Sequence, residues 1–556
     1  MVYKQFHLFG TVRSQSAKIE VQPSDDVDHL KSDLAGIFAI CDPKGITLHG
    51  SDTLLTIADV IATARSIGLK VDGCPIREPY APRELPIFGN HFEIYPDHMG
   101  NHDRLFLQFG SVIKTTNMGT INYLTNDPRV SEAALSESDY FTKMTSDPSH
   151  PLYYMRDETA LFMCDTSSSA LHIAHKFIPP SMTPNAVRQY AGNMQQAIEE
   201  SFSVFDELDR QGKAFHVYQY MFKLAGQIIY RIVLGLDVGH FNNIDTPVHE
   251  IIHLLGEYMS LMKKTSLSPQ WYKYLPFGNH KRLAEVKRRA WALVDAAIDN
   301  AEPGSDGKDA PIQTAALNST CIADYLKRAV DENGEKLPPE YRLTNIVVLI
   351  GAGFVTSSSL LSWMVYALTK YPGNQERLVQ ELVDNGCTAD KAWAYDEINA
   401  LPFLDCFIKE THRLHNPSFQ TARNTKRDVI VPGGWQIPAG AVVIPTFPSI
   451  HKNKDHWENP ERFDPDRWGG GGGAGRPDRH RLAFTPFAAG PRGCVGFNVA
   501  KLEAKLALAN LVYRYEFEDA STEPMQYDAE FLVIRPLNCY VRARRRTTWP
   551  TAQKEE

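Results

Sequence analysis

A glycine-rich segment near the C-terminus places a cysteine where its sulfur could act as a thiolate. Residues 486–503 read PFAAGPRGCVGFNVAKLE. The residues that matter in it are Phe487, Gly490, Arg492, Cys494 and Gly496. Glycines let backbone N–H groups point closely at a sulfur, and the helix expected to follow would place its positive end beside it. Because the thiolate is the form of cysteine that binds metals, Cys494 is the first candidate for a metal ligand.

This segment resembles the haem-binding loop of the cytochrome P450 superfamily. The resemblance implies haem b held through the Cys494 thiolate, with Phe487, Gly490 and Gly496 close to the cofactor and Arg492 on a propionate. A thiolate ligand pushes electron density onto haem iron and so favours cleavage of the O–O bond. The competing interpretation is a buried structural cysteine in a glycine-rich loop.

A pair of charged residues on one expected helix supports the resemblance. Glu410 and Arg413 are three positions apart, so they share a helix face and can pair. Pro460-Glu461-Arg462-Phe463 supplies a second arginine further along the chain. The resemblance implies that Glu410, Arg413 and Arg462 form a buried ion network below the haem.

The long apolar run from Ile346 to Leu368 carries the residues expected above the iron. It contains Gly-Ala-Gly-Phe-Val-Thr at positions 351–356. The resemblance implies that Ala352 lies beside bound oxygen and that Thr356 assists proton transfer. Val355 stands where the family usually has an acid, so the proton route is left open. The simpler interpretation of Thr356 is a hydroxyl bonded back to its own helix.

A second helix is expected to line the haem from the side. The resemblance implies one of two registers: in one, His175 contacts the haem, and in the other, His172 and Lys176 contact a propionate; both stay open. The resemblance also places Phe162 over the iron and Arg423 on a propionate. These positions are closest in pattern to the bacterial and fungal fatty-acid hydroxylases.

Composition excludes several other classes. The chain has 556 residues and a net charge of -8, which does not indicate a nucleic-acid partner. Its eight cysteines include no CxxC pair, which argues against a disulfide framework, a zinc ribbon or an iron–sulfur cluster. We expect a cytoplasmic protein, with a peripheral position on a membrane left open. The N-terminal residues contain no long apolar run, so we expect no transmembrane anchor there. Residues 346–368 are expected to form a buried central helix.

The chain is expected to contain a small domain followed by a large one. Residues 1–75 predict two strands, a helix and returning strands, which resembles a ubiquitin-like β-grasp domain. Residues 76–86 form a proline-rich linker, 87–545 the mainly helical haem-thiolate domain of the cytochrome P450 fold with small β-sheets, and 546–556 a tail. A run of five glycines at 469–473 predicts a flexible loop.

The resemblance implies a haem monooxygenase that inserts one oxygen atom from O2 into a hydrophobic small molecule, either a specialised metabolite or a lipid such as a fatty acid. Electrons would come from a separate NAD(P)H-dependent cytochrome P450 reductase or a ferredoxin. The alternatives are a peroxide-driven enzyme and a non-oxygenating haem-thiolate protein. A further alternative is a zinc metalloprotease, because residues 249–253 read HEIIH, with two histidines on one helix face and a glutamate as base.

Overall fold

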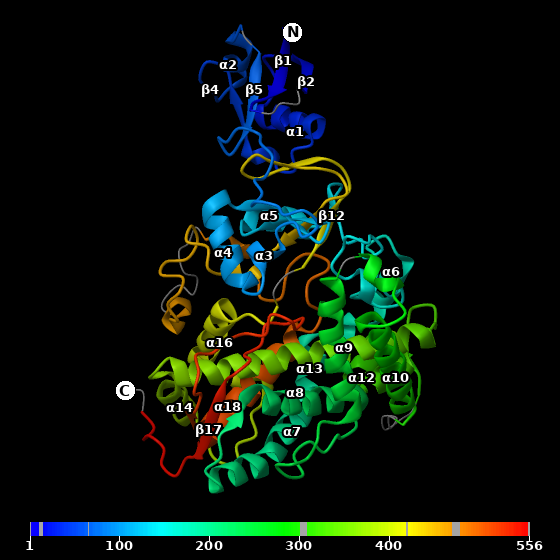
Figure 1. Ribbon diagram of the computed structural model, residues 1–556, viewed down its shortest axis with the longest axis vertical. Coiled ribbons are helices and arrows are strands. Elements are labelled where there is room, and N and C mark those ends of the chain that lie inside the picture. The colour runs from blue at the N-terminus through cyan, green and yellow to red at the C-terminus, as the bar shows by residue number, and fades with distance from the viewer. Residues whose placement is uncertain are drawn as a thin grey trace. The chain divides into compact units, whose positions relative to one another are not determined.

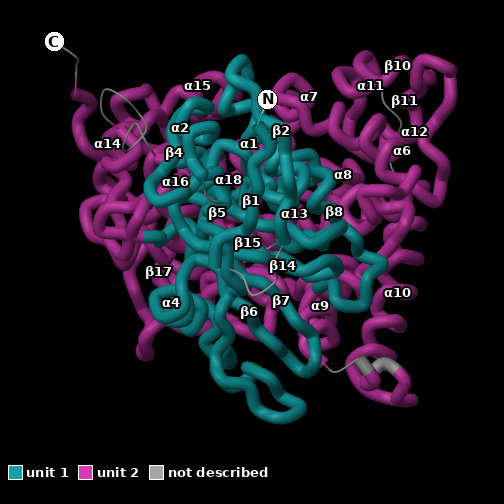
Figure 2. The backbone as a smooth tube through the Cα atoms, turned by 90° about the horizontal axis from the view of Figure 1, so that it is seen from above, with its two compact units in different colours: residues 1–151, 420–453, 480–493 teal, residues 152–419, 454–479, 494–556 magenta. Residues whose placement is uncertain are grey.

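In a computed structural model of the chain, the described residues are 2–10, 15–64, 66–268, 270–300, 308–418, 421–469 and 479–553. They form two compact units (Figure 2). Unit 1 comprises Met1–Pro151, Gln420–Asn453 and His480–Gly493, and unit 2 comprises Leu152–Phe419, Lys454–Arg479 and Cys494–Glu556. The predicted flexible glycine loop lies outside the described residues except for Gly469.

A five-stranded sheet opens unit 1, in the order β2-β1-β5-β3-β4. Its elements are β1 (Val2–Leu8), β2 (Ser16–Val21), α1 (Val27–Phe38), β3 (Ile46–His49), β4 (Thr53–Leu54), α2 (Ile57–Ala62) and β5 (Ile67–Val71). Alternate residues of β1, such as Phe6 and Leu8, enter a core that the apolar face of α1 completes. The side chain of Asp26 accepts from the backbone N–H of Asp28 and so starts α1. The element order agrees with the expected one, and the likeness to ubiquitin-like proteins stays a prediction.

The boundary predicted at residues 76–86 does not separate two compact units. Ile430, far along the chain, belongs to the same hydrophobic core as residues 1–75. Its N–H donates to the carbonyl of Ala39 at 2.8 Å, and its carbonyl accepts from Cys41 N–H at 3.0 Å. The small N-terminal sheet is therefore joined to a hairpin that the sequence placed in the large domain.

The rest of unit 1 is a second five-stranded sheet with short helices. The sheet order is β6-β7-β15-β12-β8, and a separate hairpin pairs β13 with β14. The elements are α3 (His91–Ile94), α4 (His98–Phe109), β6 (Val112–Asn117), β7 (Thr120–Thr125), α5 (Pro128–Leu135), β8 (Phe141–Thr142), β12 (Arg423–Thr425), β13 (Val429–Val431), β14 (Trp435–Ile437), β15 (Val442–Pro445) and α17 (Phe447–Ile450).

Unit 2 is a helical body around α13, which spans Pro339–Lys370 and packs against α8 and α18 (Figure 1). Its other helices are α6 (Ser169–Phe177), α7 (Pro184–Arg210), α8 (Val217–Leu234), α9 (Glu250–Ser266), α10 (Asn279–Asp299), α11 (Ile312–Asn318), α12 (Ile322–Arg328), α14 (Asn374–Asp384), α15 (Tyr395–Asn399), α16 (Pro402–Leu414) and α18 (Phe497–Arg514). Its strands are β9 (Phe215–His216), β10 (Ala310–Pro311), β11 (Ala329–Val330), β16 (Tyr515–Asp519) and β17 (Tyr540–Arg545).

The length and hydropathy of α13 would suffice to cross a membrane, but 72% of its most apolar window is buried within the protein. This agrees with the predicted buried central helix.

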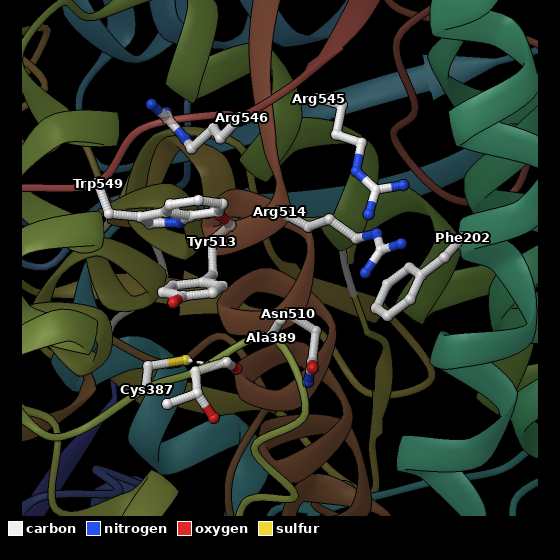
Figure 3. A pocket seen from close by; sticks show the side chains of 10 residues that line it. Phe202, Cys387, Ala389, Asn510, Tyr513, Arg514, Arg545, Arg546 and Trp549 are labelled. Carbon is white, nitrogen blue, oxygen red and sulfur yellow. Dashed lines mark hydrogen bonds between the residues drawn. The ribbon is translucent and has the colours of Figure 1, made fainter.

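Two arginines near the C-terminus share one carboxylate. Arg514 and Arg545 both pair with Asp206, at 3.0 and 2.6 Å. Beside them, Trp549 stacks on Tyr513 with ring centroids 5.4 Å apart (Figure 3). A cavity of about 40 Å³ lies among these side chains. We attribute this arrangement to fixing the tail on the helical body.

Gly490 lies in the segment that precedes Cys494. Its backbone conformation and the close approach of Leu135 both disfavour any residue with a Cβ atom. Its φ is +73°, and a Cβ placed there would lie 2.0 Å from the carbonyl oxygen of Leu135. We expect Gly490→Ala to lower the free energy of unfolding by about 2 kcal/mol or more, since the backbone cannot give way cheaply. Urea unfolding of the haem-free chain, followed by circular dichroism, would measure this loss.

Gly496→Ala is the matched control for that measurement. Gly496 has a φ of -89°, and no atom lies within 4 Å of a Cβ built on it. We expect a change of no more than about 0.5 kcal/mol. Equal losses in the two variants would contradict the steric explanation for Gly490.

Candidate functional site

Cys494 lies in unit 2, immediately before the N-terminus of α18, where Gly496 is the N-cap residue. Its side chain has an exposed face, whereas every other cysteine is buried or half-buried, and all eight are free thiols. Dense protein around the sulfur raises the pKa of the Cys494 thiol, and the backbone N–H of Gly496 acts in the opposite direction. A metal on the exposed face would remove the thiol proton, because a coordinating thiol is deprotonated.

A buried hydrogen bond links the helix that follows Cys494 to α13. The hydroxyl of Ser357 donates to Oε2 of Glu503 in α18 at 2.6 Å. Glu503 is only 1% exposed, and its burial raises its pKa to about 8. No sequence motif distinguishes this glutamate, although it stands in the helix that starts at the cysteine loop. The pair fixes α18, and with it the position of Cys494, relative to the middle of α13.

One narrow face of α13 remains accessible although the helix is mostly buried. Ala352 is exposed, and Gly353 and Thr356 are half-exposed. The Thr356 hydroxyl donates to the carbonyl of Ala352 at 2.8 Å, so it forms the backbone bond that the simpler interpretation predicted. Val355 is buried in the hydrophobic core. The proton-relay role of Thr356 stays a prediction.

Gly353 is explained by helix packing. A Cβ there would lie 2.6 Å from Cδ1 of Ile229 in α8. The close approach of α8 and α13 therefore requires a glycine, whatever the residue contributes to an oxygen site.

The residues expected beside the haem in unit 2 differ in their surroundings. Phe162 is 46% exposed. His172 and His175 of α6 are both exposed. Nζ of Lys176, in contrast, pairs with Asp331 at 2.7 Å and Glu332 at 2.6 Å. The structure therefore favours the histidines as propionate contacts, and both registers stay predictions.

In unit 1, two arginines lie near each other, and one of them pairs with a carboxylate. Arg423 pairs with Glu137 at 2.6 Å. The pKa of Arg423 is lowered to about 10, because burial and the charge of Arg492 lower it by more than Glu137 raises it. Nη2 of Arg423 is buried without a hydrogen-bond partner among the described residues. This excess of positive charge suits an anionic group such as a haem propionate.

The buried ion network forms, but with a different second arginine. Glu410 has no exposed surface and accepts from Arg413 Nη2 at 2.8 Å and from Arg467 Nε at 2.9 Å. Trp468 Nε1 also donates to it, at 2.9 Å. The prediction of Arg462 was wrong: its side chain is 71% exposed, and only its carbonyl takes part, by accepting from Arg413 at 2.9 Å.

The reason for this correction is the path of the chain. Asp464-Pro465-Asp466-Arg467-Trp468 repeats the pattern of the preceding Pro460-Glu461-Arg462-Phe463. The turn that begins at Asp464, whose N–H donates to Glu410 at 2.8 Å, directs the second copy inward.

The residues present fit a thiolate-bound haem. The exposed face of Cys494, the accessible face of α13 and the exposed Phe162 belong to unit 2, and a buried guanidinium with an unsatisfied nitrogen belongs to unit 1. Cys494 would hold the iron. The assignment of the propionates to Arg423, Arg492 and one of the two α6 histidines stays a prediction.

The HEIIH sequence does not build a zinc site. His249 is the N-cap of α9, and its Nδ1 accepts from the backbone of Ile251. Glu250 pairs instead with Arg289, at 2.9 Å. Within the part of the chain that the structure describes, no group of three His, Cys, Asp or Glu side chains could hold a metal ion. The protease interpretation is therefore not supported.

The sequence model of the cytochrome P450 family matches residues 79–542. The chain belongs to the cytochrome P450 family. Membership implies haem iron with a cysteine thiolate ligand, as the site residues indicate.

The relatives of this cytochrome P450 are of two kinds. It is 51% identical over 99% of both chains to the "Cytochrome P450 monooxygenase alnD" of Emericella nidulans, and this match includes the N-terminal sheet. It is 35% identical to cytochrome P450 4F3 of Rattus norvegicus, over 63% of this chain and 67% of that one. The crystal structure of the cytochrome P450DA heme domain has the same fold, with a TM-score of 0.74 at 22% identity, covering 85% of this chain and 98% of that chain.

The Glu410 network makes a quantitative prediction. Arg467→Ala removes a buried partner and leaves part of the Glu410 charge unmet, so we expect a loss of about 3–5 kcal/mol in the free energy of unfolding. Arg462→Ala removes an exposed side chain and should change it by less than about 0.5 kcal/mol. Urea unfolding of the two variants in parallel tests this, and a larger effect of Arg462→Ala would refute the corrected network.

Glu503 predicts a pH dependence of stability. Its pKa in the folded protein, about 8, lies above the ordinary carboxyl value. The contribution of protonated Glu503 to the free energy of unfolding is therefore complete at pH values below its pKa in the unfolded chain. It falls by about 1.4 kcal/mol per pH unit until the pH reaches its pKa in the folded protein. Glu503→Gln, which does not titrate, should gain stability relative to the native chain as the pH rises from about 5 to about 8. The exposed Glu530→Gln is the control, and a pH-independent difference for Glu503→Gln would contradict the assignment.

Proposed function

We propose that this cytochrome P450 is a haem-dependent monooxygenase that inserts one oxygen atom from O2 into a hydrophobic small molecule. The observation that carries the proposal is the exposed residue Cys494 directly before α18, a helix in which Glu503 accepts a hydrogen bond from Ser357 of α13. The name of the Emericella nidulans relative, a monooxygenase, supports the same activity.

The chain's own residues have separable tasks in this reaction. Haem iron with a thiolate ligand supplies oxygen activation and O–O cleavage. The N-terminus of α18 and the N–H of Gly496 favour the negative charge on the sulfur. Arg423 and Arg492 bring positive charge to the propionates and so orient the ring. The exposed Phe162 would narrow the space over the iron and exclude water.

The residue before Thr356 is Val355 and not an acid, so proton delivery has to use other groups. The Thr356 hydroxyl donates to Ala352, so its oxygen remains able to accept a further hydrogen bond. Val355 is buried, and an acid there would be desolvated. We propose that Thr356 passes on protons that arrive from solvent along the accessible face of α13.

Electrons are proposed to come from a separate NAD(P)H-dependent reductase or a ferredoxin, with peroxide as the alternative oxidant. We further propose a cytoplasmic location for the protein. The substrate is proposed to be a specialised metabolite or a lipid.

Cys494→Ser tests the proposed ligand. The native protein, reduced and exposed to CO, should give the long-wavelength Soret band of a thiolate-bound haem, because the thiolate donates charge to the iron. Cys494→Ser should lose that band together with substrate oxidation. Cys74→Ser, a change at a half-buried thiol of unit 1, should keep both. A normal band in Cys494→Ser would overturn the assignment.

A further inference from the structure

The short helix α5 contacts both the N-terminal sheet and the segments of unit 1 that are expected at the haem. It spans Pro128–Leu135, and its N-cap residue, Asp127, accepts from the backbone N–H of Arg129 at 2.8 Å. A helix of eight residues is marginal by itself, so its position depends on tertiary contacts. These contacts join parts of unit 1 that lie far apart in the sequence.

Asp72 connects the N-terminal sheet to the start of α5. It follows β5 directly, and its φ of +51° places it in the left-handed region. Its Oδ2 accepts from Nη1 of Arg129 and from the backbone N–H of Gly433, each at 2.8 Å. Nη2 of Arg129 also pairs with the N-cap Asp127, at 3.2 Å. One guanidinium therefore links the N-terminal sheet to the residue that starts the helix.

The middle and the end of α5 contact the segment before the cysteine ligand. Glu132 pairs with Nε2 of His480 at 3.0 Å and accepts from Nε of Arg481 at 2.9 Å. The carbonyl oxygen of Leu135 lies only 2.0 Å from where a Cβ on Gly490 would be. The same helix thus touches the beginning and the end of that segment.

The residue two positions beyond α5 holds the arginine that is expected on a propionate. Glu137 pairs with Arg423 at 2.6 Å, and the two side chains are 7% and 1% exposed. Glu137 also accepts from the backbone N–H of Lys143, at 3.2 Å. Because this pair is buried, a displacement of α5 would move the carboxylate and with it the Arg423 guanidinium.

We propose that Asp72 is a positioning residue of the haem site, and that the N-terminal sheet braces this site through α5. The Asp72–Arg129 pair fixes the start of the helix. The helix in turn fixes Glu137 and the segment before the cysteine, as a rigid element that carries coupling between separate contacts. The effect on haem rests on the proposed function, whereas the contact between the sheet and α5 does not.

Asp72→Asn isolates the ion pair. Asparagine tolerates the left-handed conformation, and its side-chain oxygen still accepts from Gly433, so only the charge opposite Arg129 is removed. In the full-length, haem-loaded chain, we expect amide hydrogens of residues 128–137 and 480–490 to exchange about threefold faster, because a partly exposed ion pair contributes modestly to local opening. Mass spectrometry of peptides measures this, and exchange in α10 of unit 2 should not change.

The rate of haem transfer from the loaded chain to apomyoglobin tests the effect on the site. Asp72→Asn and Arg129→Gln should each raise this rate by about threefold. The double variant should match Arg129→Gln, because both changes break one interaction. Arg129→Lys keeps a cation beside Asp72 and should stay within about a factor of two of the native rate. This rescue and the absence of additivity distinguish positioning through the pair from general loosening.

Asp33→Asn is the matched control within the N-terminal sheet. Asp33 is an exposed carboxylate of α1, 3.9 Å from His29 of the same helix, and its removal should change neither exchange in α5 nor haem transfer. Faster exchange confined to residues 1–75 in Asp72→Asn, or unchanged exchange throughout, would overturn the brace. So would additive effects of Asp72→Asn and Arg129→Gln on haem transfer.

The reduced, CO-bound spectrum separates this proposal from the proposed function. If the brace fails while the native chain shows the thiolate Soret band, the monooxygenase proposal stands. If the native chain lacks that band, the function is overturned, and the exchange of α5 still decides whether Asp72 holds the helix.

Discussion

Glu410 is a carboxylate without exposed surface, and its charge has to be met by donors from separate parts of unit 2. Arg413 comes from its own helix, and Asp464 N–H, Arg467 and Trp468 come from the segment before the cysteine loop. Since an uncompensated buried charge is costly, α16 and that segment can only fold together. Ser357 and Glu503 act similarly between α13 and α18. The second restraint bears on Cys494 directly, because this residue immediately precedes the helix that Glu503 holds.

The sequence predicted the ligand, the long central helix and Arg413 because these depend on local spacing. Cys494 has a distinctive order of neighbours, and Glu410 and Arg413 are three residues apart on one helix. The second arginine could not be chosen in the same way. Arg462 and Arg467 stand in two similar short patterns, and only the turn at Asp464 decides which one faces the carboxylate. Glu503 was missed for a related reason: a glutamate in a helix usually faces solvent, and its burial depends on Ser357 of a distant helix.

The extent of the N-terminal unit also could not be predicted from local sequence patterns. A proline-rich stretch is a reasonable sign of a linker, and the family match does begin at residue 79. The sheet of residues 1–75 nevertheless shares its core with Ile430, and the backbone of that residue bonds to Ala39 and Cys41. These contacts join segments almost 400 positions apart, and no local pattern in either segment announces the other. The full-length match to the Emericella nidulans enzyme indicates that the sheet and the haem domain occur together in that relative as well.

The helix α9 shows why the substrate was the hardest feature to derive from sequence. Its residues His249, Glu250 and His253 matched a zinc motif, yet they cap the helix or face an arginine and solvent. The informative residues of α9 are Tyr258 and Met259, which no motif distinguishes. One lines a cavity of about 440 Å³ between the segment before α6 and the helices α9 and α10, and the other packs against Gly351 beside Ala352. Two adjacent positions on one helix thus contact both this cavity and the helix that carries Ala352 and Thr356.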